Sequence, residues 1–108
     1  MPIIFTPDHV KMILDGKKTM TRRVHRYRLK EGNIYKVKKN WYIYYIPGLS
    51  IKVTHSIKQR LGDITPEDAM KEGGYTVEEF KEIWTKINGS WTPDLIVNVY
   101  EFEVVKKL

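Results

Sequence analysis

The residues best suited to chemistry form a basic, hydroxyl-rich block that directly follows a glycine. Gly16 can end a short amphipathic helix in a left-handed conformation. A strand over residues 19–24 would then place two hydroxyls and a guanidinium on one face, with Lys18 at its entrance. Such a face would recognise an anion or an amide; the alternative is a solvated basic turn, since charged side chains are normally exposed. The candidate binding residues are Lys17, Lys18, Thr19, Thr21, Arg22 and Arg23.

The composition indicates one domain, residues 1–108, which is long enough for a single hydrophobic core. The chain has no cysteine, which excludes disulfides, thiolate catalysis and cysteine-ligated zinc. Its longest nearly continuous apolar run, residues 41–46, is far shorter than the ~20 residues of a membrane span. The N-terminus lacks the basic flank and the length of a signal peptide. These features predict a cytoplasmic protein with no membrane partner.

Charge is distributed unevenly along the chain, whose formal net charge is +6. Residues 1–40 contain eleven lysines and arginines against three acidic residues, whereas residues 61–103 contain ten acidic residues against three lysines. Such asymmetry indicates contact with nucleic acid, because lysine and arginine displace counterions from phosphate. The alternative is that the basic half lies against acidic helices of the same fold.

Capping patterns predict three helices. Thr6 followed by Pro7 is typical of a helix start. Thr65 and Thr76 each precede a carboxylate by three residues, which is the pattern of a capping box. The first of these two later helices must end by Gly73-Gly74.

In the remaining segments, apolar and polar residues alternate as they do in β-strands. His55 falls on the apolar face of its strand, which predicts a hydrogen-bonded core histidine. Many short strands without a regular alternation with helices favour an α+β fold, a small mixed β-barrel with about three peripheral helices. The expected strands cover residues 34–38, 41–46, 51–58 and 95–105, with a turn at Pro47-Gly48.

Four segments match, in order and over nearly the whole chain, segments of one known family. They are Ile13-Leu14-x-Gly16-x-Lys18-Thr19-x-Thr21-x-Arg23, Gly32-x-Ile34-Tyr35, Asp68-Ala69-x-x-Glu72-Gly73 with Phe80 and Trp84 after it, and Val97-x-Val99-Tyr100-x-Phe102. On these segments the chain resembles the ASCH domain family. The resemblance implies a PUA-like β-barrel with a cleft and inserted helices, in agreement with the elements expected above.

The resemblance also implies function. The family as a whole is thought to bind RNA in a cleft lined by the basic block. One branch consists of amidohydrolases that remove the acyl group of N4-acetylcytidine with a lysine, a threonine and a glutamate. Lys18 and Thr21 match the first two without a gap, and Glu72 matches the third when Gly73 or Gly74 is taken as an insertion.

The residue types suit that reaction, although each also has a plainer role. A lysine in a partly dry cleft can act as a base, a threonine hydroxyl can attack an amide carbonyl, and a glutamate can protonate the leaving amine. Otherwise, Lys18 is an exposed lysine or a phosphate contact, Thr21 an ordinary strand residue, and Glu72 part of a helix end.

We therefore expect an RNA- or nucleoside-binding protein that uses a basic cleft. The alternative is an amidohydrolase that deacylates N4-acylated cytidine through the lysine, threonine and glutamate just named. A second alternative is a protein-interaction module whose basic face meets an acidic partner. The three histidines, His9, His25 and His55, lack metal-ligand spacing, so we expect no metal, and nothing in the sequence implies a cofactor.

Overall fold

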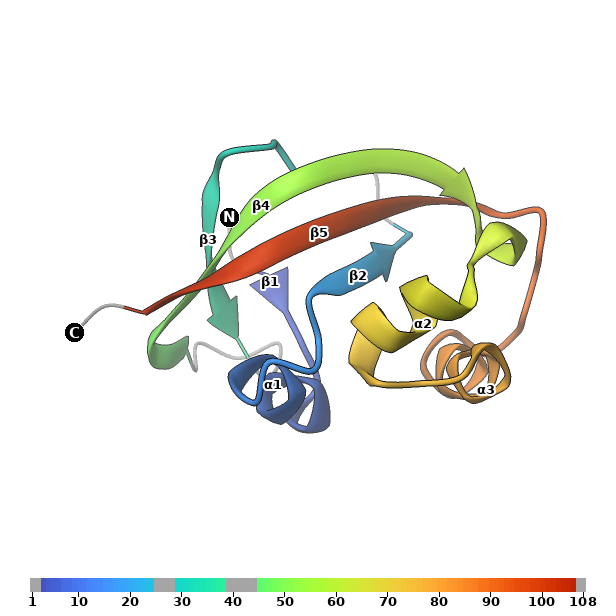
Figure 1. Ribbon diagram of the computed structural model, residues 1–108, viewed down its shortest axis with the longest axis horizontal. Coiled ribbons are helices and arrows are strands. Elements are labelled where there is room, and N and C mark those ends of the chain that lie inside the picture. The colour runs from blue at the N-terminus through green and yellow to red at the C-terminus, as the bar shows by residue number, and fades with distance from the viewer. Residues whose placement is uncertain (1–2, 25–28, 39–44, 107–108) are drawn as a thin grey trace.

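The computed structural model describes residues 3–24, 29–38 and 45–106. Three α-helices and five strands lie in these residues, and Figure 1 shows their arrangement. In chain order the elements are β1 (Ile3–Ile4), α1 (Pro7–Leu14), β2 (Met20–Arg23), β3 (Ile34–Lys38), β4 (Tyr45–Arg60), a 3-10 helix (Leu61–Asp63), α2 (Pro66–Gly73), α3 (Val77–Asn88) and β5 (Ile96–Lys106).

The described strands form one mixed sheet in the order β1-β3-β4-β5-β2. β1 and β3 are parallel, and the other neighbouring pairs are antiparallel. The long strands β4 and β5 arch over the helices, so the sheet curls into a half-barrel (Figure 1). This confirms the predicted α+β class and the small barrel-type sheet with three helices.

Local signals explain how the chain enters β2. The side chain of Thr6 accepts a hydrogen bond from the backbone N–H of His9 and caps α1. Gly16 has φ 77°, a left-handed conformation that ends the helix. The backbone N–H groups of Lys17 and Lys18 both donate to the carbonyl of Met12, which turns the chain back towards the sheet. Lys18 is therefore held at a fixed place just before β2.

Capping boxes fix the starts of α2 and α3, as the sequence predicts. The Thr65 and Thr76 side chains each accept from the backbone N–H three residues on, and the carboxylate at that residue accepts from the threonine N–H. Gly74 and Gly89 end the two helices in left-handed conformations. α2 packs against β2, so the caps and the glycine fix the position of Glu72 relative to that strand.

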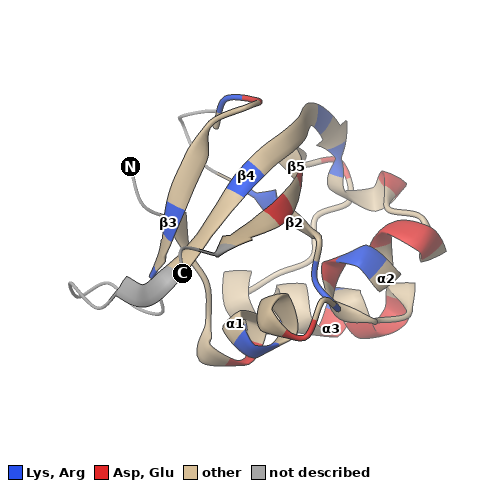
Figure 2. Ribbon diagram, turned by 60° about the vertical axis from the view of Figure 1, so that its left-hand side comes forward, with Lys and Arg blue, Asp and Glu red and all other residues tan. Residues whose placement is uncertain are grey.

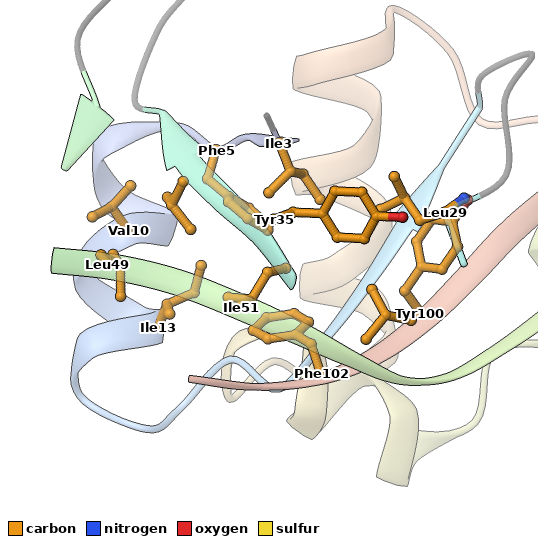
Figure 3. Close-up of a cluster of buried hydrophobic side chains, with 12 residues drawn as sticks. Ile3, Phe5, Val10, Ile13, Leu29, Tyr35, Leu49, Ile51, Tyr100 and Phe102 are labelled. Atoms are coloured by element: carbon orange, nitrogen blue, oxygen red, sulfur yellow. The ribbon is translucent and has the colours of Figure 1, made fainter. Parts of the chain in front are cut away.

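Two groups of buried apolar side chains hold these elements together. The first lies between α1 and the sheet and includes Phe5, Tyr35, Tyr100 and Phe102 (Figure 3). Both tyrosine hydroxyls in it accept hydrogen bonds from backbone N–H groups, which satisfies them in the core. The second packs α2 and α3 against β2 and β5 and consists of Met20, Leu61, Ile64, Ala69, Phe80, Trp84, Val97 and Val99.

The prediction of a core histidine is wrong because β4 contains a bulge. Val53 pairs with Phe102 and His55 with Glu101, so Thr54 is an extra residue that reverses the alternation beyond it. The His55 side chain is 57% exposed, and Nδ1 lies 3.7 Å from a carboxylate oxygen of Glu31.

The turn predicted at Pro47-Gly48 is also wrong, because both residues lie within β4. Pairing between β3 and β4 is irregular there: Lys36 pairs with Ser50 and Lys38 with Tyr45. A proline, which has no N–H to donate, is tolerated where a ladder is irregular. Most of the strand predicted over residues 41–46 falls outside the described residues.

Two short elements, β1 and the 3-10 helix, were not predicted from the sequence. β1 has only two residues, too few for an alternation pattern, and the 3-10 helix has three. β1 matters for the site because it leads into Phe5, whose backbone N–H donates to the carbonyl of Lys38 at 2.9 Å. None of the helices in the described part of the chain is long and apolar enough to cross a membrane.

We predict that Gly73→Ala destabilises the protein. A Cβ at Gly73 would lie 2.8 Å from the Tyr75 ring and 2.9 Å from Sδ of Met12. Overpacking costs about 1–3 kcal/mol, and the better helix propensity of alanine returns at most about 1 kcal/mol. Urea unfolding should show a net loss, whereas the exposed Met70→Ala in the same helix should stay within about 0.5 kcal/mol. An unchanged midpoint for Gly73→Ala would contradict the close packing of α2 on α1.

Candidate functional site

The basic block contains a lysine that is withdrawn from water. The Lys18 side chain is 2% exposed, and Nζ donates to the backbone carbonyl of Glu72 at 2.9 Å and to its Oε1 at 3.2 Å. Burial lowers the pKa of Lys18 below its ordinary value, because an ammonium loses its hydration there. The Glu72 carboxylate opposes this shift in the pKa, while the nearby charges of Arg23 and Arg22 add to it.

The next basic side chain is also buried and paired. Arg22 shares the face of β2 that carries Met20, and this face packs against α2. Its guanidinium donates to Oε2 of Glu72 at 2.8 Å, to Asp68 at 3.0 Å and to Gln59 at 2.9 Å. Figure 2 shows acidic residues gathered on α2 and α3. Lys18 and Arg22 are thus neutralised by α2 within the same fold.

Thr21 and Arg23 occupy the opposite face of β2, as the predicted alternation requires. Arg23 donates from Nε to Oγ1 of Thr21 at 3.1 Å, and its guanidinium carbon lies 4.6 Å from the centre of the Phe5 ring. Burial lowers the pKa of Arg23 to about 10, mainly because the charge loses hydration. Thr21 is buried, with its oxygen held by a cation.

Both faces of β2 contribute to one cavity of about 600 Å³. Lys18, Thr21 and Glu72 all line it, so the three residues named by the family resemblance converge. The rest of the wall is mostly apolar and comes from β1 and the two residues after it, from Val24 and Leu29, and from α1 and α3. A mostly apolar cavity with a few convergent polar groups is typical of small-molecule sites. The α3 residues of the wall are Phe80, Ile83, Trp84, Ile87 and Asn88.

Only some of the other predicted binding residues line this cavity. Arg22 and Arg23 line the same cavity, whereas Lys17 and Thr19 are exposed and do not line it. The backbone of Thr19 is hydrogen-bonded to α2 and to β5: its N–H donates to the carbonyl of Lys71, and its carbonyl accepts from the N–H of Phe102.

A second cavity of about 650 Å³ adjoins the first and contains Lys17. The two cavities share Thr6, His9, Ile83 and Ile87 in their walls. The charged residues around the second cavity are Asp8, Lys11, Asp15, Lys17 and Lys86.

Sequence reasoning missed His9, Tyr75 and Phe5 as site residues. His9 Nε2 lies 3.2 Å from the Tyr75 hydroxyl, and His9 lines both cavities. Burial and, to a lesser extent, the charges of Lys18 and Arg23 together lower the pKa of His9 to about 4, so the ring is neutral at neutral pH. Burial also raises the pKa of Tyr75. No local pattern in the sequence marks these three residues as part of a site.

A metal centre would need several ligands close together. In the part of the chain that the structure describes, no three histidine or acidic side chains are placed so that they could hold a metal ion. His25 lies outside the described residues.

Comparison with known proteins identifies the fold. No protein-family model and no curated protein matches the chain in sequence. The solved structures that match in shape include an ASCH domain from Lactobacillus crispatus (TM-score 0.74, 18% identity, covering 92% of this chain and 71% of that one). They also include protein EF3133 from Enterococcus faecalis, of family model DUF984 (TM-score 0.69, 18% identity, 98% and 77% covered), and a mutant of ZmASCH from Zymomonas mobilis (TM-score 0.65, 11% identity, 94% and 66% covered). The chain therefore has the fold of ASCH domain structures.

Proposed function

We propose that the chain binds an N4-acylated cytidine in the first cavity and hydrolyses its amide bond. The observation that carries the proposal is the convergence of Lys18, Thr21 and Glu72 on that cavity. They come from a turn, a strand and a helix, and each is only 2–4% exposed. Buried polar groups meeting at the wall of an apolar cavity support small-molecule chemistry. The resemblance to the amidohydrolase branch supports the same roles.

Lys18 is the base in this proposal. Burial lowers the pKa of Lys18, which increases the share of neutral amine at neutral pH. The neutral Nζ takes the hydroxyl proton of Thr21, directly or through one water, while Oγ1 forms a bond to the acyl carbon. Arg23 donates to that same oxygen at 3.1 Å, and in this proposal its charge stabilises the oxyanion that develops beside it.

Glu72 returns the proton in this proposal. Its Oε1 lies 3.2 Å from Lys18 Nζ, so it can accept the proton from the lysine and deliver it to the leaving N4 amine. The carbon–nitrogen bond then breaks, cytidine leaves, and an acyl ester remains on Thr21. A water molecule, deprotonated by Lys18, attacks the acyl carbon of this ester, the bond to Oγ1 of Thr21 breaks, and Lys18 returns the proton to that oxygen as the carboxylic acid leaves. The apolar wall with Phe5 and Trp84 offers a surface on which the cytosine ring can pack.

We predict that the wild-type protein releases cytidine and acetate from N4-acetylcytidine and that Thr21→Val abolishes this. Valine keeps the shape of threonine but has no hydroxyl to attack the carbonyl. Thr21→Ser keeps the hydroxyl and is the matched control, so it should retain measurable activity. Glu72→Gln should lower the rate by about 10² to 10⁴, because it removes a general acid. Chromatography of the products gives each rate.

Two outcomes would contradict the proposal. If wild-type protein releases no cytidine, Lys18, Thr21 and Glu72 are not catalytic residues. If Thr21→Val, still folded by circular dichroism, retains the wild-type rate, the threonine is not the nucleophile.

We also predict that the rate rises with pH. Only the neutral form of Lys18 accepts a proton, so activity is lost as pH falls through the pKa of this lysine. Because burial lowers that pKa, the rise in kcat/KM should be centred below 10.5, the ordinary value for lysine. A rate that is flat from acidic to alkaline pH in the folded protein would contradict a lysine base.

RNA binding is a second candidate function, favoured by the charges around the second cavity. Lys11, Lys17 and Lys86 line it, and none of them forms an ion pair with the residues that the structure describes. Asp8 and Asp15 line it as well, which leaves an excess of one positive charge. Since the two cavities share walls, a nucleotide whose base occupies the first cavity would extend its phosphates towards these lysines.

For this second function we predict a salt-dependent affinity for single-stranded RNA. Each phosphate contact contributes about −0.7 to the slope of log affinity against log salt. The double substitution Lys17→Ala and Lys86→Ala should remove about one to two phosphate contacts and so make the slope less negative by about 0.7 to 1.4. Lys81→Ala is the control, because its amine pairs with Glu78 and lines neither cavity. A slope unchanged by the double substitution, measured by fluorescence anisotropy, would contradict these phosphate contacts.

A further inference from the structure

Arg22 is bound more extensively than its neighbours in the basic block. Its side chain is 1% exposed. One terminal nitrogen donates to Oε2 of Glu72 at 2.8 Å and contacts Sδ of Met20 at 3.1 Å. The other donates to Asp68 at 3.0 Å and to Gln59 at 2.9 Å. Nε is buried and has no hydrogen-bond partner among the described residues.

Packing alone does not explain an arginine at this position. Arg22 lies on the face of β2 that carries Met20, a member of the second apolar group. A buried ion pair contributes little net stability compared with apolar side chains of similar volume, and a buried donor without a partner is unfavourable. An apolar residue would therefore suit this position for folding.

The contacts of Glu72 indicate what the arginine does. Its carboxylate has two oxygens, and each is committed to a different cation: Oε2 to Arg22 and Oε1 to Lys18. Because Arg22 is also bound to Asp68, which lies one helical turn before Glu72, it ties the carboxylate to α2 and β2 at once. Without this anchor, the carboxylate could rotate and present either oxygen, or neither, to Lys18.

We propose that Arg22 is a positioning residue, which binds Oε2 of Glu72 and so holds Oε1 on the amine of Lys18. The inference rests on the proposed amidohydrolase function, in which the proton passes between Lys18 and Glu72. Although Arg22 lines the cavity, its side chain is 1% exposed and both terminal nitrogens are bound within the protein, so in this proposal it acts through Glu72.

Arg22 also acts on Lys18 electrostatically. The charged groups that face the Lys18 amine are Glu72, Arg23 and Arg22, while His9 beside them is neutral at neutral pH. Arg22 is a like charge and contributes to the lowered pKa of Lys18. Removing it leaves Arg23 as the one like charge among these groups, so the pKa of Lys18 should rise.

The test compares Arg22→Met and Arg22→Lys with the control Met70→Ala, a substitution of an exposed residue of α2. Arg22→Met should lower kcat for N4-acetylcytidine about 10²-fold, as expected when a catalytic group is misplaced by about 1 Å. KM should change less than about threefold, because the terminal nitrogens of Arg22 are bound to Glu72, Asp68 and Gln59 and not to the substrate in this proposal. Arg22→Lys keeps the charge but not the planar fork, so kcat should fall as well. Met70→Ala leaves the contacts among Arg22, Glu72 and Lys18 in place and should retain kcat within about threefold.

A second measurement does not depend on activity. NMR titration of the Lys18 ε-methylene should show a higher midpoint in Arg22→Met than in wild type, and a nearly unchanged one in Arg22→Lys. A folded Arg22→Met protein with wild-type kcat, or with an unmoved Lys18 midpoint, overturns the inference. If wild type hydrolyses nothing, the proposed function fails, and the Lys18 midpoint alone decides the positioning role. If Arg22→Met does not fold, Arg22→Lys decides it: a folded protein with wild-type kcat overturns the inference.

Discussion

The arrangement of this protein depends on one buried contact, the ammonium of Lys18 beside the carboxylate of Glu72. Removing an ammonium from water is unfavourable unless a partner and hydrogen bonds compensate for the lost hydration. The fold supplies both, because Glu72 offers its backbone carbonyl as well as its carboxylate to the same amine. This requires α2 to lie against the turn before β2, and the caps of α2 and the left-handed Gly16 make that approach possible.

The contact between Lys18 and Glu72 also affects how charge is distributed over the protein. Part of the positive charge of the N-terminal half is neutralised within the fold, because α2 supplies carboxylates to Lys18 and Arg22. The excess positive charge is therefore not concentrated on the face of β2 that the sequence indicates. Buried cations that are already paired favour chemistry on a small ligand in a cavity over contact with a phosphate backbone, since phosphate contacts require cations that the ligand can reach.

Sequence reasoning succeeded where the determinants are local. Threonine caps and left-handed glycines act within a few residues, and the three helices follow from them. It failed in β4, because the bulge at Thr54 depends on pairing with β5, and one extra residue turns His55 outwards. The basic block was evident from its composition, but the orientation of Arg22 depends on α2, about fifty residues away. Glu72 emerged only through the family resemblance, and His9 had no signal at all.

The most direct test of this account is the titration of Lys18 in the wild-type protein, followed by NMR of its ε-methylene group and assigned by loss of the signal in Lys18→Arg. An amine held out of water must titrate below 10.5, the ordinary value for lysine, because burial outweighs the attraction of Glu72. A midpoint below that value is the predicted result. A midpoint at or above it would show that Lys18 remains a fully charged ion-pair partner, which would contradict its role as the base of a hydrolytic site.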